Sequence, residues 1–310
     1  MRLLIVLLLV TFGVSLLLRL IPVDLADVLL PQGSAEERDA FRTEIGLDKG
    51  MVGYYLQWLG NFVQGDFGKV YFAGGTEEVF TRVAIALPRS LLLMIYTQVF
   101  ALAISIPLGV ISAYRAGRRA DRIISNSLFI FSSVPSFAIA LTLMIVVGVQ
   151  LKWLPALGYA TFSEGIWEHL KHMIMPVVSL GLGLIAVYTR LLRADMISTL
   201  REDYVTMAVS KGLSDKRILW RHVFRPSSLT LFTSAALNMG GLIGGAIVIE
   251  SIFATYGMGY GVFAAIAGRQ YVELQSMVAL IALFYVFFNL VVDVGAEFVD
   301  PRTRDRKLNA

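Results

Sequence analysis

Long apolar runs restrict the possible folds of this chain more than any other feature of its sequence. They cover residues 87–113, 123–149, 173–192, 229–249 and 277–298, and each contains at least twenty residues. At about 1.5 Å per residue, twenty helical residues cross the roughly 30 Å hydrocarbon core of a bilayer. Lipid offers the backbone no hydrogen-bond partners, so spanning runs of this kind form helices. The pattern therefore predicts an all-α membrane protein.

The composition agrees with that class and argues against nucleic acid as a partner. The 310 residues are 56% hydrophobic and 16% charged, whereas about a quarter of a soluble domain is charged. The net charge is +4, but the basic residues are spread over the loops, which is typical of topology signals. The chain has no cysteine, which excludes disulfides and thiolate metal sites. Membrane lipid is the environment that this composition predicts.

A further charge-free run covers residues 3–18 behind Arg2. A secretory signal peptide and a first membrane span both fit its length and its positive start. No A-x-A-like cleavage site follows, and the segment to Pro22 extends the run to about the length of a span. Arg19 can extend its charged end to the far headgroups. We favour an uncleaved first transmembrane helix, which brings the expected number of spans to six.

The lysines and arginines predict the orientation of these spans. The segments predicted to face inward contain 17 Lys and Arg, and the short segments predicted to face outward contain 3. Both termini are therefore expected in the cytoplasm. Residues 1–85 would form the first transmembrane helix plus an extracytoplasmic segment. Residues 86–300 would form a five-helix core, and 301–310 a cytoplasmic tail.

The predicted extracytoplasmic segment, residues 23–85, is acidic and contains one clear helix signal. Ten acids against five Lys and Arg give it a charge of −5, which suits the outer side. The piece 47–68 reads as a short amphipathic helix that ends at Gly65. Its large apolar side chains are predicted to lie at the membrane interface. They are Tyr55, Trp58, Leu59 and Phe62.

The longest charged segment between two apolar runs covers residues 203–225. Thr199 and Glu202 have the spacing of a capping box that starts a helix, and Gly212 stands where a left-handed residue would end it. Ser214 is placed to cap a second helix. Arginines recur at every fourth position of that helix, at Arg217, Arg221 and Arg225. Two short helices hinged at a glycine beside a membrane suit a docking element for another protein, and an ordinary basic cytoplasmic loop is the alternative.

This segment resembles the coupling loop, or EAA loop, of ABC-transporter permeases. It is most similar to the oligopeptide/dipeptide branch, whose version reads D-Y-x-x-x-A-x-x-K-G-L. The matching residues are Asp203, Tyr204, Ala208, Lys211, Gly212 and Leu213, and Ser214 completes the predicted coupling residues of loop 199–226. The chain departs from the general pattern at Thr206 and Met207, and Pro226 comes earlier than usual. The resemblance extends over the whole chain, including the piece 47–68.

The resemblance implies a six-helix type I ABC importer permease fold with cytoplasmic coupling helices. It further implies a second homologous permease subunit, two cytoplasmic ATPase subunits and an extracytoplasmic solute-binding protein as partners. ATP and Mg²⁺ would bind the ATPase subunits, and this chain would carry no cofactor. The solute would be a peptide or a similar small molecule, and the location a bacterial or archaeal plasma membrane.

Two groups of residues are candidates for the translocation path. The fifth apolar run contains two overlapping G-x-x-x-G pairs, which suit either tight helix packing or the wall of a path. These glycines are Gly240, Gly241, Gly244 and Gly245, with Asn238 nearby as a polar residue expected to face the bundle interior. The third run contains a serine-rich kink around Ser133 and Pro135. That kink is either a lining of the path or a packing notch.

No catalytic site is predicted, because the chain has no G-x-x-x-x-G-K-[ST] phosphate loop, no G-x-S-x-G elbow and no H-E-x-x-H pair. His169 and His172 make a poor metal site by themselves and are predicted at an interface. An ion-coupled secondary transporter or channel is the alternative function. It would need ionisable groups at mid-membrane depth, and the spans contain almost none.

Overall fold

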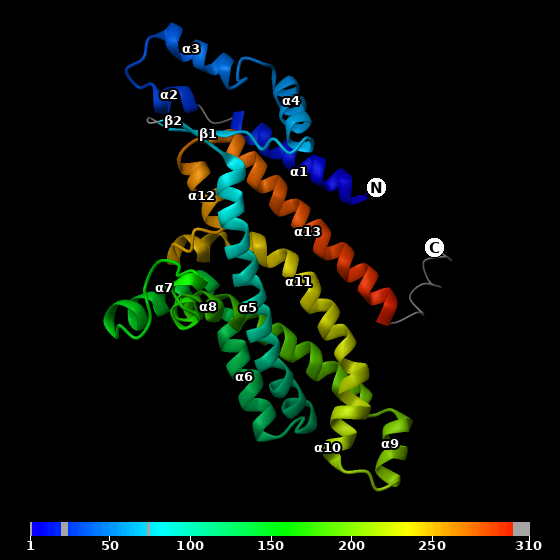
Figure 1. Cartoon of the computed structure of the whole chain (residues 1–310). Helices are drawn as coiled ribbons and strands as arrows, with labels where there is room; N and C mark the ends of the chain where they lie inside the picture. The colour runs from blue at the N-terminus through cyan, green and yellow to red at the C-terminus, as the bar shows by residue number, and fades with distance from the viewer. Residues whose placement is uncertain (1, 20–23, 73–74, 300–310) are drawn as a thin grey trace. The chain divides into compact units, whose positions relative to one another are not determined.

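The computed structural model describes residues 2–19, 24–72 and 75–299, with the backbone alone for 2–4, 18–19, 243–245 and 291–299. The described chain is mostly helical (Figure 1). Its N-terminal part contains α1 (Arg2–Arg19), α2 (Leu25–Leu29), α3 (Ala35–Glu44), α4 (Met51–Val63), β1 (Lys69–Phe72) and β2 (Gly75–Glu78). The middle contains α5 (Val79–Tyr114), α6 (Arg119–Ser133), α7 (Ser136–Leu143), η1 (Met144–Gln150), η2 (Phe162–Glu164) and α8 (Ile166–Thr199). The remainder contains α9 (Asp203–Ser210), α10 (Asp215–Arg217), η3 (Ile218–Val223), α11 (Phe224–Phe253), α12 (Met258–Ala267) and α13 (Tyr271–Val299).

The described chain divides into two compact units. The first unit consists of the chain up to Leu91 and of Thr255–Val286, and the second of Leu92–Ala254 and the chain from Phe287 onward. The predicted divisions at residues 85 and 300 concern membrane topology and stay predictions. The predicted tail, 301–310, lies outside the described residues.

Aromatic side chains of α4 form the core of the first unit. Tyr55, Trp58 and Phe62 are each less than a tenth exposed and pack with Phe12 of α1 and Ala279 of α13. The Trp58 indole N–H donates to Ser276 Oγ at 3.0 Å, which satisfies its polar edge. The predicted helix and its end at Gly65 are confirmed. These rings are covered by two other helices, and their predicted place at a membrane interface stays a prediction.

The acidic segment is more ordered than the sequence indicated. Capping boxes begin α2 at Asp24 and α3 at Ser34. Arg42 then binds the carboxylates of Asp24 at 2.7 Å and Asp27 at 3.1 Å. Burial acts to raise the pKa of Asp24, but the hydrogen bond and charge of Arg42, together with the backbone N–H groups of Asp27 and Ala26, outweigh it and the pKa is lowered. β1 and β2 form an antiparallel hairpin, which the sequence analysis did not predict.

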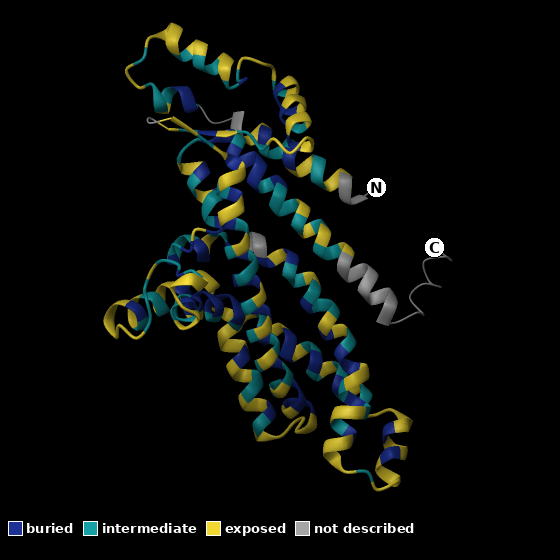
Figure 2. Cartoon of the chain, viewed as in Figure 1, coloured by how far each residue is buried: buried dark blue, intermediate teal, exposed yellow. Residues whose placement is uncertain are grey.

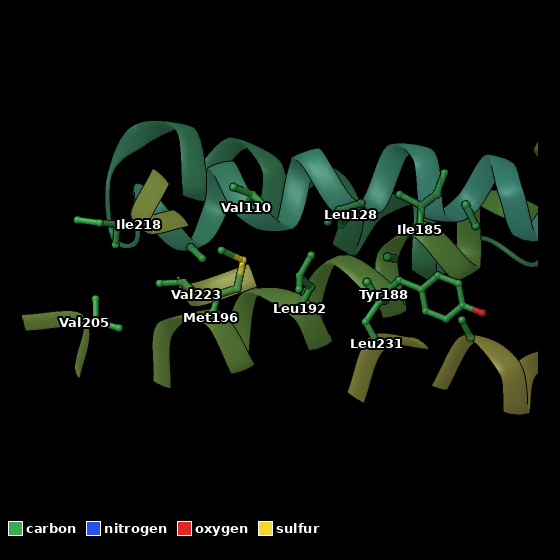
Figure 3. Close-up of a cluster of buried hydrophobic side chains, with 14 of the residues drawn as sticks. Val110, Leu128, Ile185, Tyr188, Leu192, Met196, Val205, Ile218, Val223 and Leu231 are labelled. Atoms are coloured by element: carbon green, nitrogen blue, oxygen red, sulfur yellow. The ribbon is translucent and has the colours of Figure 1, made fainter. Parts of the chain in front are cut away.

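The second unit is built around α8, which contacts α6, α7 and α11. Its buried side chains include Tyr188, Leu192 and Met196, none of which is exposed to solvent (Figure 3). Gln98 of α5 and Tyr188 share a buried hydrogen bond at 3.1 Å, and Asn238 of α11 also bonds Tyr188. This polar group joins α5, α8 and α11 inside an otherwise apolar core.

The exposed side chains of the second unit are largely apolar, which suits contact with lipid. Figure 2 shows exposed residues along much of α6. Ile123, Phe129 and Ile130 of that helix are each more than 60% exposed. A water-soluble surface would rarely expose so many large apolar side chains together. The burial pattern therefore agrees with a membrane-embedded unit.

The helix lengths are compatible with the predicted spans. Within the described residues, three helices are long and apolar enough to cross a membrane, and up to five are if each bent pair is one span. One bent pair turns by 90° between Ser133 and Ser136, where the sequence predicted a kink at Pro135. The described apolar part of α1, Ile5–Leu17, is shorter than a full span. The count of six stays a prediction.

Candidate coupling interface

Helix α9 attaches to the second unit by one narrow apolar edge. Val205 and Ala208, one helical turn apart, are 3% and 6% exposed and pack in the cluster that contains Ile218 and Val223 of η3. Figure 3 shows Val205, Ile218 and Val223 at the end of the cluster, beyond Met196. The rest of α9 is exposed. The helix is therefore held from one side and presents its other faces outward.

Gly212 ends α9 in the predicted left-handed conformation, with φ of +74°. The Gly212 N–H donates to the Val209 carbonyl at 2.9 Å, and the Leu213 N–H donates to the Ala208 carbonyl at 3.3 Å. These two bonds are the Schellman motif, which satisfies helix-end carbonyls. Leu213 also packs against the apolar cluster. The glycine thus reverses the chain so that α10 returns beside α9.

The helix after Gly212 is longer than the short helix that the sequence predicted. α10, η3 and α11 follow one another without a break, so the predicted short helix is the beginning of a long one. Pro226 has no N–H to give to the His222 carbonyl four residues earlier. The Tyr204 hydroxyl donates to that carbonyl at 3.3 Å. The irregular turn is therefore stabilised by α9 itself.

Two predicted caps are absent from the described structure. Thr199 is the last residue of α8 and bonds Ser227 through their hydroxyls at 2.9 Å, so it does not cap α9. Glu202 takes the N-cap position of α9, with no side-chain cap hydrogen bond. Ser214 takes the N-cap position of α10, also without a side-chain bond. The capping-box prediction was wrong because α8 extends further than expected.

The exposed face of this element is basic. Residues 201–225 contain six Lys and Arg against three Asp and Glu, a net charge of +3. Lys211 and the arginines Arg217, Arg221 and Arg225 are all exposed. Tyr204 is half-exposed beside them, and partial burial with the Glu202 carboxylate raises the pKa of its hydroxyl. The tyrosine therefore stays neutral and able to donate at physiological pH.

Two sets of contacts that the sequence analysis did not predict lie near this element: one joins it to α5, and the other joins α5, α6 and α8 to one another. The Tyr114 hydroxyl, at the end of α5, donates to the Asp215 carboxylate at 2.5 Å. Asp121, in the first turn of α6, accepts two bonds of 2.7 Å from Arg193 of α8. Asp121 also accepts bonds from Ser112 and from the Gly117 N–H. Asp121 is the one acid among the four arginines of residues 114–122, the only sequence signal for this network.

The predicted path residues lie apart from this element. Ser133 donates to the Phe129 carbonyl of its own helix at 2.8 Å, beside the kink at Pro135. Asn238 donates to the Ser234 carbonyl at 2.8 Å and reaches Tyr188. Gly240 is buried, whereas an ideal Cβ on Gly241 meets no described atom within 4 Å. The packing around Gly244 and Gly245 lies outside the described side chains.

His169, which the sequence analysis predicted at an interface, is buried in the second unit. His169 has no exposed surface, and its ring lies 4.2 Å from the Phe162 ring, measured between centroids. Its Nδ1 bonds the Ala160 carbonyl at 2.8 Å, and its Nε2 bonds Tyr96 at 3.2 Å. Nδ1 therefore holds the loop before α8, and Nε2 joins α8 to α5. Among the described residues, no group of three or more His, Asp or Glu is placed to hold a metal ion.

Comparison with known proteins identifies the family. Residues 105–305 match the family model described as "Binding-protein-dependent transport system inner membrane component". The chain belongs to this family. It is thus the permease subunit of an ABC importer, a multi-pass inner-membrane protein whose ATPase is a separate subunit. The comparisons lend no support to a secondary transporter or channel.

Curated relatives and solved structures agree with this membership. The chain is 32% identical over 292 residues to the probable peptide ABC transporter permease protein y4tP of Sinorhizobium fredii, covering 94% of this chain and 93% of that one. It is 35% identical over 274 residues to the oligopeptide transport system permease protein AppB of Bacillus subtilis, covering 88% and 86%. An inward-facing structure of the MetNI methionine ABC transporter matches with a TM-score of 0.59 at 14% identity. That match covers 71% of this chain and 97% of the other, and it supports the type I importer permease fold.

Proposed function

We propose that this permease carries peptides or similar small solutes and docks its ATPase subunits through α9 and α10. The single observation that carries the docking proposal is the construction of this element. A short helix is pinned by two buried side chains and reversed at a left-handed glycine, and it presents a face of net charge +3. Its residues match the coupling-loop pattern of peptide permeases. The names of the y4tP and AppB relatives support the solute class.

The assembly that we propose contains four further chains. A second homologous permease subunit completes the path, and two cytoplasmic ATPase subunits bind ATP and Mg²⁺. An extracytoplasmic solute-binding protein delivers the solute, and this chain holds no cofactor of its own. Both termini lie in the cytoplasm of a bacterial or archaeal cell. The excess of 17 over 3 Lys and Arg on the inner side supports this orientation.

The exposed glycine of α11 supports a contact beyond this chain. An ideal Cβ on Gly241 would meet no described atom within 4 Å, so its small size is not needed for packing within the described chain. Helix faces with small residues allow close approach of a second helix. We assign Gly241 to the boundary with the second permease or the path, and Gly240, Gly244 and Gly245 stay candidates for the path or for helix packing. Ser133, Pro135 and Asn238 are the further candidates for the path.

Site-directed cross-linking tests the docking element. The chain has no cysteine, so a single Ser214→Cys change introduces one unique thiol at an exposed position. We expect this thiol to cross-link to an ATPase subunit in membranes of cells that express the importer. Ser163→Cys, equally exposed but in a segment predicted to face outward, is the matched control. Cross-linking of the ATPase from position 163 but not from 214 would contradict the proposal.

Energy coupling is tested by reconstitution. The purified permease should show no ATPase activity, because it lacks a phosphate-binding loop. Activity should appear when the ATPase subunits are added and should rise with peptide-loaded binding protein. Uptake of radiolabelled trialanine into the same proteoliposomes reports the solute class. ATP turnover by the isolated chain, free of contaminants, would reject the assignment of ATP to the partners.

A further inference from the structure

A pocket of about 210 Å³ lies within the first unit, between the N-terminal ends of α5 and α13 and the short helix α12. Its polar and aromatic lining consists of Arg82, Tyr256, Tyr260 and Glu273, and Gly261 and Met277 lie beside them. An ideal Cβ on Gly261 would lie 2.6 Å from Met277 Sδ, so only glycine lets α12 approach α13 this closely without rearrangement. The pocket has room for one end of a peptide rather than a whole one.

The charges in the pocket wall do not balance. Arg82 Nη1 lies 3.1 Å from Glu273 Oε1, and Arg82 Nε lies 2.8 Å from Glu77 Oε2. Two carboxylates therefore share one guanidinium and leave one negative charge in excess. The Glu273 side chain lines the pocket and is only 1% exposed, whereas Glu77 is more than a third exposed and lies outside it. Since a buried charge is stable only when it is well paired, the wall favours a second cation.

Two tyrosines give the pocket a surface suited to an ammonium group. The rings of Tyr256 and Tyr260 lie 4.8 Å apart between centroids, at an interplanar angle of 76°. The face of an aromatic ring attracts a cation, and paired rings recognise ammonium ligands in other proteins. Tyr256 is about half exposed, so a solute can reach it.

The backbone at both ends of α12 is held in an unusual conformation. Tyr256, before the helix, has φ of +54°, and Arg269, after it, has φ of +56°. Such values are uncommon for residues other than glycine, and they concentrate at ligand-binding sites. The Met258 N–H donates to Ser90 Oγ at 2.8 Å, and Tyr71 N–H donates to the Gln270 side chain at 3.0 Å. These bonds hold α12 over the pocket despite the strain.

We propose that this pocket binds the protonated amino terminus of a peptide as it enters the permease. The Glu273 carboxylate accepts hydrogen bonds from the ammonium group, and the rings of Tyr256 and Tyr260 attract its positive charge. Arg82 positions the Glu273 carboxylate through their 3.1 Å ion pair. This inference rests on the proposed peptide solute, and it adds a solute contact within the permease itself.

Binding to the permease–ATPase complex in lipid nanodiscs, with no binding protein present, tests the site. Ligand-observed NMR titrations would compare trialanine, trialanine amide and N-acetyl-trialanine. We expect trialanine and its amide to bind alike, because both keep the ammonium group. N-acetyl-trialanine should bind about tenfold more weakly, the effect of one charge-assisted hydrogen bond. Equal binding of the acetylated peptide, or no binding of any probe at millimolar concentration, would overturn the proposal.

Two matched pairs of variants locate the binding in this pocket. Glu273→Gln should weaken trialanine binding about tenfold, whereas Glu77→Gln, on the other side of the same arginine, should change it little. Tyr256→Leu should weaken binding, whereas Tyr256→Phe, which keeps the ring, should not. The tyrosine pair remains informative if Glu273→Gln fails to fold. Equal effects within both pairs would place the amine elsewhere.

Failure of this inference is distinguishable from failure of the proposed function. ATP-driven import of trialanine in proteoliposomes with the binding protein tests the solute class alone. Import without amine-dependent binding in the nanodiscs rejects the pocket and leaves the peptide permease intact. Amine binding without peptide import rejects the peptide solute, and the pocket would then bind the amine of another kind of solute.

Discussion

At Gly212, a substitution would test backbone conformation alone, because an added side chain would meet no described neighbouring atom. Its φ is +74°, and no described atom lies within 4 Å of an ideal Cβ on it. A side chain there would cause backbone strain without a steric clash, about 1–2 kcal/mol for a β-branched residue. We expect Gly212→Val to leave the permease inserted and abundant. Peptide uptake should fall about tenfold, because about 1.4 kcal/mol changes a docking equilibrium by that factor.

The matched control for this substitution lies in the other unit. Gly65 ends α4 with φ of +86°, the same Schellman pair of bonds and no described atom near its Cβ position. Gly65→Val therefore introduces the same kind of strain at a site remote from α9 in the sequence. Uptake assays at matched expression should show a much smaller loss for this variant. Equal losses would mean that Gly212 acts through general stability rather than through docking.

At the scale of one element, the packing of α9 against the second unit depends on very little buried surface. Val205 is 3% exposed and Val209, on the same helix, is 59% exposed. Val205→Ala should destabilise the docking of α9 by about 2 kcal/mol, through lost burial and the cavity that remains. Hydrogen exchange of the α9 amides should then become faster, with the α8 amides unchanged. Val209→Ala is the control. An equal acceleration of exchange in both variants would contradict the packing of α9 through Val205.

At the scale of the whole molecule, the orientation of the chain is the main prediction. A reporter fused after Lys307 and one inserted near Gly117 should both report the cytoplasm. A reporter inserted near Gly74 should report the outer side, because the charge bias places that segment there. Protease protection in spheroplasts and membrane vesicles gives an independent measurement. Cytoplasmic labelling near Gly74 would contradict the six-span topology.

The sequence by itself determined the class, the family and the local backbone conformation at Gly212 and Gly65. These properties depend on hydropathy along one segment and on the steric freedom of single glycines, and neither needs a distant residue. Only the tertiary structure decided that Tyr55, Trp58 and Phe62 are buried, since that depends on which helices cover them. The same holds for Asp121 with Arg193, which are 72 positions apart, and for the pocket at Glu273. Contacts of this kind follow from helix packing, and the periodicity of one helix does not specify which helix packs against it.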